Sequence, residues 1–157
     1  MTKILSVLWA SALFLPLAAA ADDDLTVVVN KSNTVENLTK AQLCKIVLGQ
    51  QAAWPGAKKV MVVLRAPGQP DRKGVLRSVC GMGEDDFTTH QMQASFNGDA
   101  GSPPKVVASD EAVRDTVAAQ PGAIGFLQTA DVNDTVRSVT VDGVAAGKDG
   151  YKVKSAK

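Results

Sequence analysis

The chain has 157 residues, and its 17 basic and 16 acidic side chains give a formal net charge of +1. This length suits a single domain, and 45% hydrophobic with 21% charged residues is a globular rather than a disordered balance. A near-neutral chain with 4% aromatic residues lacks the basic surface and stacking side chains of a nucleic-acid binder. One histidine and two cysteines are too few for a standard structural zinc site, so no metal is expected. No cofactor is predicted either.

Residues 1–21 are predicted to be a cleaved signal peptide. Lys3 provides a positive start, residues 4–17 form an uncharged apolar run, and four alanines at 18–21 offer a cleavage site. The apolar run is short for a transmembrane anchor. The mature chain, residues 22–157, is therefore expected to be one domain in the periplasm or secreted, with no membrane span after cleavage.

Because an exported protein meets an oxidising environment, its two cysteines could form a disulfide. Cys44 and Cys80 each lie on an apolar stripe of a predicted helix. A disulfide between them would stabilise the fold by about 4 kcal/mol in the chain-entropy model. Alternatively, both are small buried side chains on helices that cover opposite faces of a sheet and cannot meet. The sequence leaves both possibilities open.

In chain order, the first half alternates between strand and helix. Residues 25–30 are a β-branched run typical of a strand buried on both faces. Thr39 and Gln42 have the spacing of a capping box, which predicts a helix over 40–48. After a turn, a second apolar strand is predicted over 60–65.

The second half continues the alternation. Pro70 suits the first position of a helix that is predicted to end near Cys80. The remaining predicted elements are a helix over 85–95, a loop over 96–104, a short strand near 106–107, a helix over 110–119, and strands over 123–127 and 136–141. Alternating strands and helices predict an α/β fold, a three-layer sandwich with a mostly parallel sheet.

Two sequence blocks carry a family resemblance. Residues 38–49, followed by Trp54, and residues 117–126 resemble, in the same order, two signatures of the phosphate-binding proteins of ABC transporters. A Phe-Asn-Gly stretch at 96–98 is similar to a loop of that family. These PstS-like proteins belong to the type 2 periplasmic binding-protein superfamily. The resemblance implies one lobe of a two-lobed clamp, a small oxyanion such as phosphate as ligand, and an ABC transporter as partner.

The family also has an anion motif, in which an arginine is followed after three residues by Ser-Gly-Thr at a helix start. Arg65 matches the arginine, whereas Gln69, Pro70 and Asp71 stand in place of Ser-Gly-Thr. Pro70 has no backbone N–H to donate, and Asp71 adds a negative charge. The chain departs from the family pattern at this turn.

A helix N-terminus still attracts anions, because its N–H groups and its dipole present positive charge. The predicted ligand-binding residues at this turn are Arg65, Gly68, Gln69, Asp71 and Arg72, and a second polar cluster at the end of the first strand adds Asn30 and Ser32. The alternative is structural: a solvated strand end and helix face for the first group, and turn formation for the second.

These patterns favour a non-catalytic protein, because no nucleophile motif is present and a catalytic triad would depend on the single histidine, His90. The expected function is an exported solute-binding-type protein that recognises phosphate or another small oxyanion as an accessory to uptake or sensing. The alternative is an interaction module that kept the fold and lost the ligand. A single lobe would expose the surface that its missing partner lobe covers, so a second protein chain could bind there.

Overall fold

The structure is a computed structural model that describes residues 23–56, 58–99 and 101–157. The predicted signal peptide lies outside these residues. Six strands form one sheet in the order β2-β6-β1-β5-β3-β4. Their bounds are β1 Leu25–Asn30, β2 Asn37–Leu38, β3 Met61–Arg65, β4 Lys105–Val107, β5 Ala123–Gln128 and β6 Val136–Val141.

Strand β1 runs against the rest of the sheet. It pairs antiparallel with both β5 and β6, whereas the pairs β2–β6, β3–β4 and β3–β5 are parallel. Five strands therefore run in one direction, which confirms the mostly parallel sheet. All six residues of β1 are buried, as its β-branched sequence predicts for a central strand.

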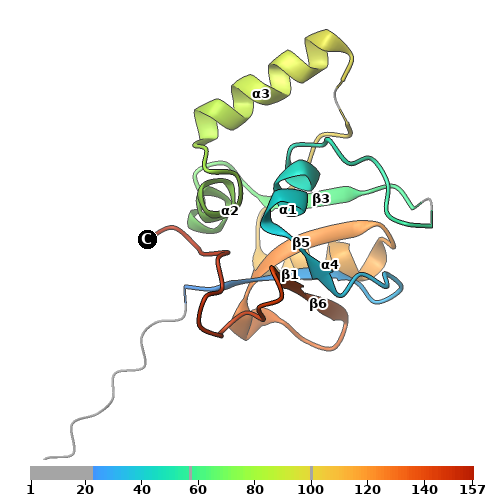
Figure 1. Ribbon diagram of the computed structural model, residues 1–157, viewed down its shortest axis with the longest axis vertical. Coiled ribbons are helices and arrows are strands. Elements are labelled where there is room, and N and C mark those ends of the chain that lie inside the picture. The colour runs from blue at the N-terminus through green and yellow to red at the C-terminus, as the bar shows by residue number, and fades with distance from the viewer. Residues whose placement is uncertain (1–22, 57, 100) are drawn as a thin grey trace, which may run out of the picture.

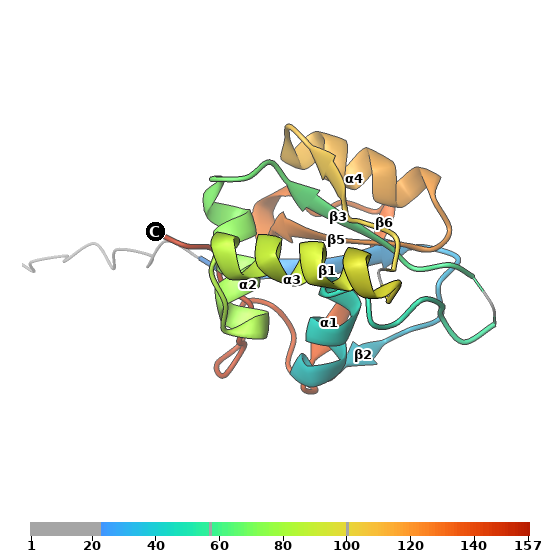
Figure 2. The ribbon, with the colours of Figure 1, turned by 90° about the horizontal axis from the view of Figure 1, so that it is seen from above.

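Four helices and one 3-10 turn complete the fold: α1 Lys40–Val47, α2 Pro70–Cys80, α3 Glu84–Asn97, α4 Asp110–Ala119 and η1 Thr129–Asp131. Helices α1 and α2 cover one face of the sheet and α4 covers the other (Figures 1 and 2). Each face has its own hydrophobic cluster, one containing Leu43 and Leu76 and the other Val113 and Val117. The three-layer α/β architecture is confirmed.

Two elements differ from the prediction. Strand β2 was not predicted, because two residues are too few to show a strand period. Helix α3 continues beyond Ser95 to Asn97 and so takes Phe96 out of the predicted loop. It ends where Gly98 adopts a left-handed conformation with φ of 73°, which glycine adopts readily.

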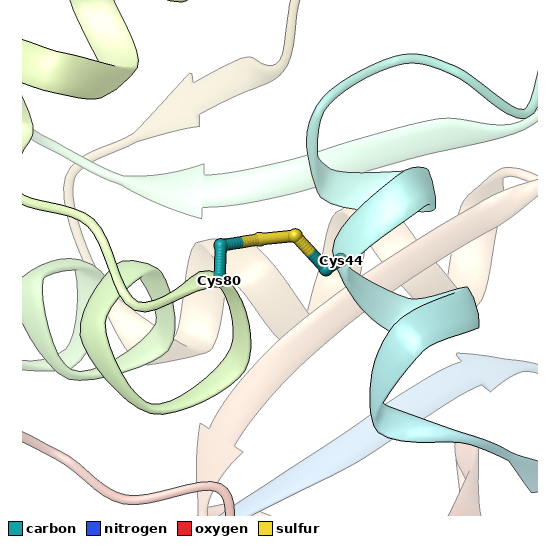
Figure 3. Close-up of a disulfide and its surroundings, with 2 residues drawn as sticks. All are labelled: Cys44 and Cys80. Carbon is teal, nitrogen blue, oxygen red and sulfur yellow. A yellow bond between two sulfur atoms is a disulfide. The ribbon is translucent and has the colours of Figure 1, made fainter.

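The two cysteines form a disulfide between α1 and α2 (Figure 3). The Cα atoms of Cys44 and Cys80 are 5.1 Å apart, within the range that a disulfide requires. Both helices lie on the same face of the sheet, so the alternative of opposite faces is wrong. The bond ties the end of α2 to the middle of α1.

Helix α3 projects from the body of the molecule (Figure 1). Phe87 is its only buried residue, while Met92 and Phe96 are 55% and 87% exposed. None of the described helices is both long enough and apolar enough to cross a membrane.

The C-terminal segment packs against α2. Ala156 N–H donates to the carbonyl of Pro70 over 3.0 Å, and Lys154 N–H donates to Ser78 Oγ over 3.2 Å. A Cβ atom on Gly74 would lie 2.2 Å from the carbonyl oxygen of Lys154. Glycine at this helix position therefore permits the close backbone contact.

Candidate functional site

The candidate site lies at the carboxyl ends of β3, β4 and β5, the edge at which open α/β sheets place ligands. Arg65 is the last residue of β3, and it pairs with Val107, the last residue of β4. This parallel register places the start of α4, which follows β4, beside Arg65. Gln128, the last residue of β5, lies at the same edge.

Arg65 is the central cation of this edge, and its side chain is 15% exposed. Its Nη1 atom makes an ion pair with Asp110 Oδ1. Its Nη2 atom donates to the carbonyl of Ala108 over 3.2 Å and to Gln69 Oε1 over 3.4 Å. The predicted residues Arg65 and Gln69 are therefore in contact, and the guanidinium already has an anionic partner.

Asp71 is also at this edge, but it is held mainly by other residues. Its Oδ1 atom accepts hydrogen bonds of 2.7 Å from Gln128 Nε2 and from Ser155 Oγ. Its Oδ2 atom lies 3.8 Å from Arg65 Nη1. The C-terminal segment and β5 thus fix the Asp71 carboxylate close to the Arg65 guanidinium.

Arg72 attaches α3 to α2. Its Nε atom lies 2.9 Å from Glu84 Oε2, and its guanidinium carbon lies 5.5 Å from the centre of the Phe87 ring. The backbone N–H of Gly68 donates to Glu84 Oε1 over 3.2 Å. The predicted residues Gly68 and Arg72 therefore both contact Glu84, a carboxylate of the protein itself.

Arg65 Nε is buried and has no hydrogen-bond partner among the described residues. A cavity of about 10 Å³ lies between α2 and the sheet and is lined by Val63, Leu64, Arg65, Asp71, Arg72, Val75 and Phe126. This volume holds about one water molecule and is too small for a tetrahedral oxyanion. A larger anion would have to reach Arg65 from the solvent side of the turn at residues 66–69, between β3 and α2.

The charges at this edge largely neutralise one another. Three carboxylates pair with two guanidinium groups: Asp71, Asp110 and Glu84 with Arg65 and Arg72. Burial raises the pKa of Asp110 above its usual value, although the hydrogen bond and the charge of Arg65 oppose the shift. Anion binding here therefore requires some rearrangement of these pairs.

The second predicted cluster lies at the opposite end of the sheet. Asn30 ends β1, which is antiparallel to β5 with Val29 opposite Ile124, near the start of β5. Asn30 Nδ2 donates to two carbonyls at the end of α4, and Asn30 Oδ1 accepts from the N–H and hydroxyl of Ser32. The contacts with Ser32 form a turn, and the contacts with α4 satisfy carbonyl groups at the end of that helix. Because this cluster lies at the other end of the sheet, the structure does not bring Asn30 and Ser32 together with Arg65.

The sequence analysis missed the side chains that surround Arg65. The predicted helix over 110–119 placed Asp110 only at a helix start, and the sequence assigned no contact to Gln128 or Ser155. The signal for Asp110 exists in principle: with β4 parallel beside β3, the residues after both strands meet at one edge. That inference needs the strand order, which the sequence pattern does not provide.

Within residues 23–56, 58–99 and 101–157, no group of three or more histidine, cysteine, aspartate or glutamate residues is arranged to hold a metal ion.

No protein-family model matches the chain. Solved structures match most of it. The ABC-type phosphate transport receptor from Vibrio cholerae aligns with 79% of this chain at 23% identity and a TM-score of 0.65. PstS from Borrelia burgdorferi aligns with 85% at 18% identity and a TM-score of 0.67. The phosphate-binding protein from Stenotrophomonas maltophilia aligns with 79% at 14% identity and a TM-score of 0.57.

The chain has a PstS-like fold. It spans about half the length of these structures, covering 48% of the Vibrio protein, 55% of the Borrelia protein and 40% of the Stenotrophomonas protein. The expected resemblance to one part of a longer binding protein is confirmed at the level of the fold. The PstS-like sheet places Arg65 at its carboxyl edge.

Proposed function

We propose that this PstS-like chain is an exported, non-catalytic solute-binding protein that recognises phosphate or another small oxyanion. It acts as an accessory to uptake or sensing, and its partner is an ABC transporter or a second protein chain. The similar structures support a solute-binding role, since they are phosphate receptors and phosphate-binding proteins. The proposed export follows from the signal peptide that residues 1–21 predict.

The observation that carries the proposal is the position of Arg65. Its guanidinium lies at the carboxyl edge of the sheet, beside the first turn of α2. The exposed residues Gly68 and Gln69 adjoin it on the solvent side. A guanidinium near a helix start binds oxyanions by charge-assisted hydrogen bonds.

The affinity should be modest. An anion that is held on one open surface keeps much of its contact with water, and the local carboxylates oppose its charge. Micromolar or tighter binding would therefore require a second chain to cover the site.

The test is calorimetric titration of the mature protein with phosphate, sulfate and a phosphonate. Arg65→Ala should weaken binding at least tenfold, which corresponds to about 1.4 kcal/mol. Arg137→Ala is the control, because Arg137 pairs with Glu36 and lies opposite Val29, at the far end of the sheet. Equal losses in the two variants would reject the Arg65 site.

A second function, a protein-interaction module, is favoured by the surface of α3. Phe87 anchors this helix, and Phe96, nine residues later, lies on the opposite side at about 100° per residue. Met92 shares the Phe96 face, and both are exposed. Exposed apolar side chains on a projecting helix are typical of an interaction surface. A folded protein that binds none of the three anions would favour this function.

A further inference from the structure

The Arg65 guanidinium already binds an anion, the side chain of Asp110. Nη1 of Arg65 contacts Oδ1 of Asp110, and both side chains are largely buried, with exposed fractions of 15% and 23%. We infer that Asp110 is an internal ligand of Arg65, which an incoming oxyanion must displace. This inference rests on the proposed function, since it concerns the regulation of the same site.

Asp110 is the carboxylate at this edge that can leave most easily. Asp71 is held by two hydrogen bonds of 2.7 Å, from Gln128 and Ser155, and Glu84 is bound to Arg72. Among the described residues, the Asp110 carboxylate makes a hydrogen bond only to Arg65. One contact holds Asp110 in place, whereas several hold each of the other two.

The position of Asp110 in the chain also favours its release. It is the first residue of α4, which Ser109 caps through a 3.1 Å hydrogen bond from the N–H of Ala112. A carboxylate in the first turn of a helix is stabilised by the helix dipole even when it turns to solvent. The cap does not depend on Asp110, so the helix start survives the exchange.

An oxyanion at Arg65 and the Asp110 carboxylate compete for the same Nη donors. While Asp110 is ionised and bound, the incoming anion also meets its negative charge across a partly buried site, where screening is weak. Asp110 thus sets the affinity of the site by competing for Arg65.

The test uses Asp110→Asn, which keeps the size of the side chain and removes its charge. Glu111→Gln is the matched control: Glu111 lies in the same first turn and carries the same charge, but it is exposed and makes no hydrogen bond or ion pair with a described residue. Inorganic phosphate is titrated calorimetrically into the wild type, both variants, Asp110→Ser and the double variant Arg65→Ala/Asp110→Asn. Circular dichroism confirms that each variant is folded.

Asp110→Asn and Asp110→Ser should strengthen phosphate binding at least tenfold, and Glu111→Gln should change it less than twofold. The gain should vanish in the double variant, because the Arg65 guanidinium, for which phosphate and Asp110 compete, is absent. Phosphate binding by the wild type that the Asp110 variants leave unchanged or weaken would overturn the internal ligand while leaving the proposed function intact. Equal gains from Glu111→Gln would also overturn it, since the loss of any negative charge near the start of α4, rather than the loss of the Asp110–Arg65 ion pair, would then explain the stronger binding. No phosphate binding in any folded variant would overturn the proposed function and the internal ligand together.

Discussion

Helices α2 and α3 follow one another in the chain but depend on different interactions. Six of the 11 residues of α2 are buried, and a disulfide, the sheet and the C-terminal segment all contact this helix. One of the 14 residues of α3 is buried, and the helix projects from the body (Figure 1). Tertiary contacts therefore position α2, which carries the candidate site, far more firmly than α3.

The sequences of the two helices reflect this difference. Helix α2 contains Gly74, Val75 and Val79, which are poor helix formers, and packing compensates for them. Helix α3 has three acidic residues in its first turn and the left-handed Gly98 at its end. Both helices thus have local start and stop signals, and α2 adds extensive packing against the core to them.

The largest expected difference concerns the disulfide, which constrains α2 and not α3. The double variant Cys44→Ala/Cys80→Ala should lower the free energy of unfolding by about 4 kcal/mol, because the bond closes a loop between residues 36 apart. Chemical denaturation of the oxidised wild type and of the variant measures the change. Reduction of the wild type should produce a similar loss, and a loss below about 1 kcal/mol would contradict the prediction.

The next effect compares a buried with an exposed side chain. Leu76→Ala in α2 should cost about 3 kcal/mol, since Leu76 is 0% exposed and its removal leaves a cavity in the core. Met92→Ala in α3 should change stability by less than about 0.5 kcal/mol, because Met92 is 55% exposed. Urea unfolding curves for both variants test the contrast, and similar midpoints would show that α3 packs more closely than described.

The smallest effect concerns glycine. Gly74→Ala would raise helix propensity, but its Cβ would meet three backbone atoms within 2.6 Å, so we expect a net loss of about 1–2 kcal/mol. Gln93→Gly, at an exposed position of α3, should cost about 1 kcal/mol through propensity alone. Thermal unfolding compares the two. Stabilisation by Gly74→Ala would mean that the C-terminal segment does not hold its position on α2.

Much of the fold could be predicted because its signals are local. The buried run of β1, the Thr39–Gln42 capping box of α1 and the proline at the start of α2 each specify an element from a few neighbouring residues. The alternation of strands and helices predicted the mostly parallel sheet, and the residue blocks that resemble phosphate-binding proteins implied the same fold. The two-residue β2 has no such pattern.

The candidate site could be predicted only in part. Arg65 and the turn that follows it were identified from the residues, because an arginine before a helix start suggests anion binding by itself. The contacts that define the environment of Arg65 come from Asp110, 45 residues away, and the Asp71 contact comes from Ser155, 84 residues away. Neither spacing carries a signal in a single sequence.

The sequence by itself therefore determined the α/β alternation, most of the element boundaries and the position of the candidate arginine, since hydrophobic period, caps and turns act over a few residues. Only the tertiary structure decided that β1 runs antiparallel, that α1 and α2 share a face and join through a disulfide, and that carboxylates from distant segments surround Arg65. The physical reason is that strand order and helix placement come from burying both faces of the sheet at once. That is a property of the whole chain.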